Sequence, residues 1–177
     1  NLCNILIIFS LIIPGNIPVF SQELKFSRIG AEEGLSQSVV NCVIQDKKGF
    51  MWFGTDDGLN RYDGYEMRIL KNIIDKENSL SNNGILSLYE DENEILWIGT
   101  NGGGLNAYNP VTNTFKRYLN NQQNPGTISN NVVKTIFEDR ENNLWLGTEE
   151  GLNLLDRNSG KFTRYGLESG PRSETAL

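Results

Sequence analysis

The chain is 177 residues long, a length that suits one domain with a sizeable core. Its 16 basic and 22 acidic residues give a formal net charge of -6, and no basic stretch interrupts this balance, which argues against nucleic acid as a partner of this part. The sequence contains no histidine, so it lacks the commonest general base and a favoured zinc ligand.

Residues 1–21 read as a secretory signal peptide. Residues 5–13 form a short apolar run that a Pro-Gly pair ends, and residues 19–21 are tolerated before a cleavage site. The run is short for a permanent membrane-spanning helix, and the alternative is an ordinary buried segment. An initiator Met and a positively charged start would lie upstream of Asn1, so we expect a chain truncated at its start. The mature chain, from about residue 22, is expected outside the cytoplasm.

Residues 24–30 are expected to form an isolated strand. The sequence FSRI at 26–29 resembles FKRY at 115–118 and FTRY at 162–165, which end two later units. No inner strands precede this segment with which it could pair. Its partner strands are therefore expected outside this sequence.

Three tryptophans mark a repeat of nearly fixed period. The same phrase recurs as MWFGTDDGLN, LWIGTNGGGLN and LWLGTEEGLN, and its tryptophans lie 45 and 48 residues apart, at Trp52, Trp97 and Trp145. An aspartate precedes each tryptophan by six residues, and a serine precedes each aspartate by ten: Asp46, Asp91 and Asp139; Ser36, Ser81 and Ser129. A repeat of this period indicates units that stack on copies of themselves.

Each unit has the pattern of four short strands. In the third unit, polar or Gly-containing turns separate four β-branched and aromatic runs, at about 131–139, 144–148, 152–156 and 161–166. Four strands in about 45 residues are typical of a propeller blade. The sequence therefore predicts an all-β fold, a β-propeller with about three four-stranded blades of an incomplete ring, at about 36–75, 81–120 and 129–166.

Three blades do not close a ring, and a closed propeller often uses its first strand to complete its last blade. We therefore expect residues 24–30 to be a closing strand whose partner blade is not in this sequence, and residues 166–177 to lead toward a fourth blade. The chain is then a fragment whose two end blades expose apolar faces, and it is expected to aggregate when expressed alone.

The repeated positions favour structural roles over chemical ones. The three tryptophans could stack on sugar rings, but their identical place in every unit favours packing between blades. The three aspartates could bind metal or act as acid and base, but their equal spacing spreads them around the ring and favours turn stabilisation. The glycine two residues after each tryptophan is expected to let neighbouring sheets approach closely.

The loops that follow each Gly-Thr pair differ between units, reading DDG, NGGG and EEG. Variable loops on a rigid scaffold are where binding variety lies, although most such loops are solvated turns. NGGG lacks GxGxxG spacing and a following helix, which argues against a phosphate cradle. The candidate ligand-binding residues are Asp56, Asp57, Asn101, Glu149 and Glu150. The Asn-rich stretches 78–84 and 120–131 read as links between blades.

The shared pattern V-x-x-I-x-[QE]-D-x-x-x-x-[ML]-W-[FIL]-G-T-x-x-G-L-N resembles the two-component regulator propeller repeat, over about residues 24–165. The resemblance implies the periplasmic sensor part of a hybrid two-component system, commonly with two seven-bladed rings, then a β-sandwich, a membrane helix and a histidine kinase. It also implies an oligosaccharide ligand and a homodimer at full length. No kinase motif is present in these residues, so a signalling role would belong to other domains of the same protein.

Two other functions stay open. One is an enzyme on a propeller, such as a sialidase-like hydrolase or a streptogramin-lyase-like enzyme. A lyase of this type is expected to use histidines, and the sequence has none. The other is an interaction scaffold without a small ligand. The residues present nominate no catalytic residue, metal ligand or cofactor. Cys3 would be removed with the predicted signal peptide, so Cys42 is expected to be a lone thiol. The two cysteines therefore predict neither a disulfide framework nor a CxxC metal site.

Overall fold

The computed structural model describes residues 26–165; the predicted leader, the start of the predicted closing strand and the predicted tail lie outside this range. The described residues form one 3-10 helix, η1 (Ala31–Glu33), and twelve strands. The strands are β1 Val40–Gln45, β2 Met51–Thr55, β3 Gly58–Tyr62, β4 Met67–Leu70, β5 Ile85–Glu90, β6 Leu96–Thr100, β7 Leu105–Asn109, β8 Thr114–Tyr118, β9 Val133–Glu138, β10 Leu144–Thr148, β11 Gly151–Asp156 and β12 Lys161–Tyr165.

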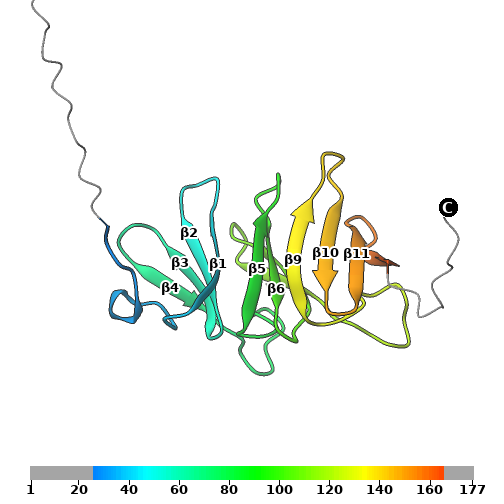
Figure 1. Ribbon diagram of the computed structural model, residues 1–177, viewed down its shortest axis with the longest axis horizontal. Coiled ribbons are helices and arrows are strands. Elements are labelled where there is room, and N and C mark those ends of the chain that lie inside the picture. The colour runs from blue at the N-terminus through cyan, green and yellow to red at the C-terminus, as the bar shows by residue number, and fades with distance from the viewer. Residues whose placement is uncertain (1–25, 166–177) are drawn as a thin grey trace, which may run out of the picture.

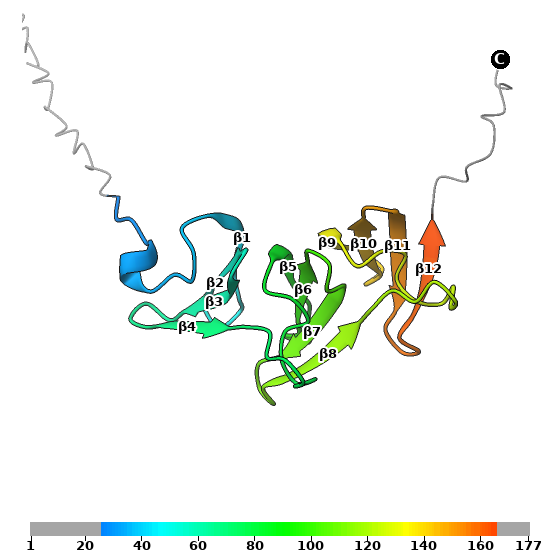
Figure 2. The same cartoon turned by 90° about the horizontal axis from the view of Figure 1, so that it is seen from below.

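Each run of four consecutive strands forms one antiparallel sheet, and the three sheets stand side by side (Figure 1). Figure 2 shows them fanned around a common centre, with β1, β5 and β9 toward the centre and β4, β8 and β12 away from it. Neighbouring blades touch through β1 and β5 and through β5 and β9. The predicted all-β propeller with three four-stranded blades is confirmed. Among residues 26–165, no helix is both long and apolar enough to cross a membrane.

The blades have two edges that carry different segments. The links between blades, residues 71–84 and 119–132, lie at one edge with the β2–β3, β6–β7 and β10–β11 loops, and we call this the link edge. The remaining turns lie at the opposite edge, which we call the turn edge. At the link edge, Gly58 N donates to Asn83 O at 2.9 Å and Gly104 N donates to Asn131 O at 2.7 Å. Each link is thus tied to the loop of the blade before it.

One face of each sheet carries the tryptophan and packs on the next blade. Trp52 is 1% exposed and meets Tyr108 of blade 2 edge to face, with ring centroids 5.9 Å apart. Trp97 is 4% exposed and belongs to a cluster with Leu146 and Phe162 of blade 3. Each interblade gap therefore has its own apolar core built on an indole. The predicted packing role is confirmed for Trp52 and Trp97.

Glycine two residues after each tryptophan allows this close approach. A Cβ added at Gly54 would lie 2.6 Å from Ile85 Cγ2 of blade 2, and one added at Gly99 would lie 2.7 Å from Val133 O of blade 3. Both distances are too short for ordinary contact, so a side chain there would push the blades apart. The predicted role of these glycines is confirmed.

A buried asparagine ties each blade to the segment that enters it. Asn106 is fully buried; its Oδ1 accepts from Ser81 N at 3.0 Å, and its Nδ2 donates to Ser81 Oγ at 2.7 Å. The same pairing recurs between Asn60 and Ser36 and between Asn153 and Ser129. These bonds explain why a serine keeps its place in every unit.

Replacing Asn106 with alanine is expected to lower the free energy of unfolding by about 1–3 kcal/mol, because the Ser81 N–H loses its acceptor in a part-buried place. Urea unfolding followed by circular dichroism measures the change. Asn158→Ala, in the exposed β11–β12 turn, is the matched control and is expected to leave the midpoint nearly unchanged. Equal losses in the two variants would contradict this assignment.

Arginines of the outer strands hold the links. Arg117 donates from Nε to Ser79 O at 3.0 Å and from Nη2 to Lys76 O at 2.8 Å. Arg164 donates from Nε to Thr127 O at 2.8 Å in the next link. Arg28 has the equivalent place in the predicted closing strand, but residues 26–29 form no strand here, and Phe26 is largely exposed. The closing role of this segment stays a prediction.

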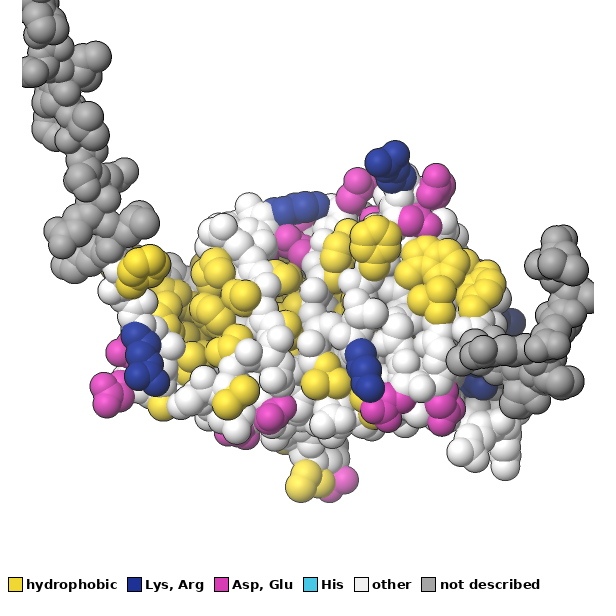
Figure 3. Space-filling model, in the orientation of Figure 1, with side chains coloured by type: hydrophobic (Ala, Val, Ile, Leu, Met, Phe, Trp, Pro, Cys, Tyr) yellow, Lys and Arg dark blue, Asp and Glu magenta, His cyan; other side chains and the backbone are white. Residues whose placement is uncertain are grey.

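Both end blades expose apolar faces, as predicted. On blade 3 the exposed side chains include Phe137, Leu152 and Tyr165, and half-buried Trp145 lies 5.5 Å from Tyr165 between ring centroids. On blade 1 they include Val43 and Ile69. Figure 3 shows hydrophobic side chains gathered toward both ends of the row of blades.

Candidate functional site

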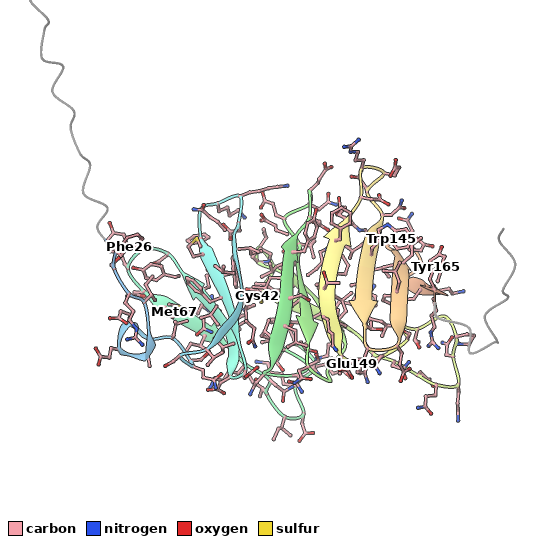
Figure 4. The ribbon with its side chains drawn as sticks, viewed as in Figure 1. Phe26, Cys42, Met67, Trp145, Glu149 and Tyr165 are labelled. Carbon is pink, nitrogen blue, oxygen red and sulfur yellow. The ribbon has the colours of Figure 1, made fainter. Side chains whose placement is uncertain are left out.

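The candidate residues named from the sequence lie in equivalent loops at the link edge. Asp56 and Asp57 are in the β2–β3 loop, Asn101 follows β6, and Glu149 and Glu150 are in the β10–β11 loop. Figure 4 shows Glu149 at the end of its blade opposite to the turn between β9 and β10. One loop per blade places the residues along one edge without joining them in a cluster. Within residues 26–165, no three His, Cys, Asp or Glu side chains are placed to hold a metal ion.

Three of these carboxylates have partners from neighbouring segments. Asn41 Nδ2 donates to Asp56 Oδ1 at 2.8 Å, Lys71 pairs with Asp57 at 2.7 Å, and Lys134 pairs with Glu149 at 3.0 Å. Exposed pairs of this kind contribute about 0–1 kcal/mol, so a ligand with good geometry can replace them. Asn101 is held through its backbone, since its N–H donates to Gly84 O at 2.8 Å. A ligand role for the candidates stays a prediction.

At the turn edge, each repeated aspartate holds its turn and the tryptophan. Asp91 accepts from Asn93 N at 2.9 Å, from Ile95 N at 3.0 Å and from Trp97 Nε1 at 2.9 Å. The indoles of Trp52 and Trp145 donate in the same way to their own aspartates. The turn-stabilising role is confirmed. The indole bond was missed, although the constant spacing of six residues between aspartate and tryptophan was a signal for it.

Asp139 gives this arrangement a pH dependence. Hydrogen bonds from the indole N–H of Trp145, at 2.7 Å, and from Asn143 and the backbone N–H of Glu141 lower the pKa of Asp139 from 3.8 to about 2. A carboxyl whose pKa falls on folding stabilises the native state at pH values above 3.8, and the contribution is lost as the pH falls toward 2. Asp139→Asn is therefore expected to be less stable than the unsubstituted protein at neutral pH, with the difference shrinking between pH 4 and pH 2. Urea midpoints across this range test the expectation, and a constant difference would contradict it.

A groove between blades 2 and 3 lies at the turn edge, with a volume of about 330 Å³. We call it the Trp97 groove, after the indole in its floor, and Ala107 lies beside this indole. Arg157 of blade 3 reaches into it: its Nη1 lies 3.5 Å from Asp91 Oδ2, and its guanidinium carbon lies 5.7 Å from the centre of the Trp97 ring. Arg157 also pairs with Glu138. Sequence reasoning missed this groove because its walls come from two repeats.

Three antiparallel sheets fanned around one centre define this chain as part of a β-propeller. A family model described as "Two component regulator propeller" matches residues 34–57, 79–102 and 127–150, which carry the first two strands of each blade. The three blades thus carry three repeats of the two-component regulator propeller type.

Two similar proteins carry the names of a hybrid two component system and of a histidine kinase. The extracellular domain of the hybrid two component system BT3049 from B. thetaiotaomicron is 35% identical, with a TM-score of 0.74, over 79% of this chain and 20% of that chain. Histidine kinase P4 from Formosa agariphila is 47% identical over 49 residues, which are 28% of this chain and 4% of that protein. The chain thus spans a fifth or less of the length of these relatives.

A virginiamycin B lyase from Staphylococcus aureus has a TM-score of 0.53 and 14% identity, over 73% of this chain and 42% of that chain. At such low identity the likeness shows the fold alone. It therefore adds no support to the alternative of an enzyme on a propeller.

Proposed function

We propose that this chain is part of the periplasmic ligand-sensing propeller of a hybrid two-component regulator, which recognises oligosaccharides and relays the signal to a histidine kinase in the same protein. The observation that carries the proposal is the similarity to an extracellular domain of a hybrid two component system over 79% of the chain. The residues present would bind ligand, and phosphoryl transfer would belong to domains beyond them.

The chemistry of the link edge supports a polyhydroxylated ligand. Its loops differ from blade to blade while their strands stay the same, which is how a rigid scaffold varies what it binds. Carboxylate oxygens accept from sugar hydroxyls, and amide and ammonium groups donate to them. Asp56 with Asn41, and Glu149 with Lys134, present such acceptor and donor pairs side by side.

Calorimetric titration of the protein at its natural length with a broad oligosaccharide panel tests binding. Saturable heat with one ligand class is expected, and Asp56→Ala or Glu149→Ala should weaken it. Glu141→Ala, in the exposed β9–β10 turn at the opposite edge, is the matched control and should bind as the unsubstituted protein does. No heat across the panel would sink the oligosaccharide claim.

The relay is tested separately. A ligand found by calorimetry is expected to change kinase autophosphorylation in the membrane-inserted protein, and the same loop variants should shift its half-maximal concentration. Light scattering with and without ligand would show whether two copies associate, as proposed for the full-length protein. Ligand binding without any change in autophosphorylation would show that the protein binds the ligand but would refute the proposed sensing role.

A further inference from the structure

The position opposite each tryptophan on the neighbouring strand differs among the three repeats. Trp52 pairs with Arg61, Trp97 with Ala107, and Trp145 with Leu154. In blade 1, the Arg61 guanidinium carbon lies 3.7 Å from the centre of the Phe50 ring and 5.9 Å from that of Trp52, so a long side chain covers this site. Ala107 has no such side chain. The Trp97 groove therefore opens where the repeat carries its smallest residue.

Arg157 enters this space from blade 3 with an unused donor. Its Nε is buried and has no hydrogen-bond partner within the described residues, while its Nη atoms face Asp91 and Glu138. A buried donor without a partner costs about 1–3 kcal/mol, and such groups in native proteins usually meet a water, an ion or a ligand. Arg157 is also one of the residues that line the groove, so its guanidinium group brings positive charge to this space.

The rest of the rim also offers donors. Lys116 forms no ion pair among residues 26–165, and its Nζ lies 4.8 Å from the centre of the Tyr118 ring. Asn109 Oδ1 already accepts from Val111 N and Thr112 N, which leaves its NH₂ group to donate. The oxygens of Asp91, which is 2% exposed, are occupied by the indole and two backbone N–H groups. A ligand of this rim must bring acceptors.

The floor is apolar. It includes Ile95, Trp97, Ala107 and Tyr118, and the groove volume of about 330 Å³ is within the roughly 300–1,000 Å³ of small-molecule pockets. An apolar floor beside charged donors fits a small ring that carries an anionic group. A planar carboxylate suits a guanidinium and an ammonium group that line the same groove.

We propose that the Trp97 groove binds a carboxylate carried on a ring, with the ring against the Trp97 side and the carboxylate accepting from Arg157 and Lys116. Two sources share this chemistry, a sugar acid of a glycan and an aromatic acid. The groove is at the turn edge, so its occupancy does not depend on the sensing role proposed for the loops of the link edge.

Calorimetric titration of the natural-length protein with digalacturonate and with benzoate tests the proposal. At least one of the two is expected to bind, and which one binds identifies the source. Neutral galactobiose, matched in size to digalacturonate, is expected to bind about tenfold more weakly because it lacks the charge. The proposal is overturned if neither acid binds, or if the only binding is by galactobiose or is equal for galactobiose and digalacturonate.

Two variants with precedents in blade 3 place the binding in the groove. Ala107→Leu fills it as Leu154 does in the equivalent place, and Lys116→Thr removes the ammonium group where blade 3 has Thr163. Each is expected to raise the Kd of the acid about tenfold. Arg61→Ala, at the equivalent place in blade 1, should leave it unchanged. If Ala107→Leu does not fold, Lys116→Thr decides whether the site exists, because Lys116 is exposed and its replacement should not prevent folding. Unchanged binding of the acid by Lys116→Thr refutes the site.

Discussion

Alanine in place of Trp97 is expected to loosen the contact between blades 2 and 3, with the free energy of local opening lowered by about 3–5 kcal/mol. The indole is 4% exposed and packs in a cluster with Leu105, Leu144 and Leu146. The substitution leaves a cavity and also removes the 2.9 Å bond to Asp91. Because each blade contacts only its neighbours, the effect should stay local. Hydrogen exchange of β6, β9 and β10 in the natural-length protein measures it.

Two controls separate packing from the hydrogen bond and from general damage. Trp97→Phe keeps most of the ring volume but lacks the N–H, so it should show a smaller loss, of about 1–3 kcal/mol. Trp52→Ala should speed exchange in β2 and β5 and leave β10 protected, since its indole packs on blade 2. Faster exchange in all blades with either variant would contradict the local account, and unchanged exchange in Trp97→Ala would refute the packing role.

The regular part of the fold was predictable because each blade must bury its face on the next. That requirement fixes an indole, a small glycine beside it and a turn aspartate at the same place in every repeat, and the structure confirms all three at Trp97, Gly99 and Asp91. The arginine of the FKRY and FTRY phrases was visible as a repeated residue. Its bonds to the links were not predictable, because they join residues about 40 positions apart, as in Arg117 and Lys76.

The candidate site was less predictable because it depends on where repeats differ. The loops at the link edge were located correctly in the chain, but exposed residues such as Glu149 and Glu150 carry little information about a ligand. Predicting the Trp97 groove would have required two facts that the structure shows. Ala107 lies opposite Trp97, and Arg157 reaches across from blade 3. Only the small residue opposite the tryptophan leaves a signal in the sequence. The signal is seen when the residue that follows each Leu-Asn pair is compared between the three units.

Valine in place of Gly99 is expected to separate blades 2 and 3 at their inner strands. The Cβ would lie 2.7 Å from Val133 O and 2.9 Å from Val133 Cγ1, and Val133 is fully buried in β9. A backbone oxygen cannot rotate away, so the sheets must move, and such overpacking costs about 1–3 kcal/mol. Gly99→Ala should show a smaller loss of the same kind. Thermal unfolding and hydrogen exchange of β9 in the natural-length protein measure both.

The third repeat provides the matched control for this prediction. A Cβ at Gly147 would meet a methyl group of Thr135 in its own sheet, and no following blade faces it in the described residues. Gly147→Val should therefore disturb the contact between blades 2 and 3 less than Gly99→Val does. A Cβ at Gly99 also comes close to Ser87 Oγ in its own sheet. Combining Gly99→Ala with Val133→Ala removes one of these three clashes and should recover part of the loss, so that the two effects are not additive. Strict additivity, or a Gly99→Val variant as stable as the unsubstituted protein, would show that the blades do not need this close approach.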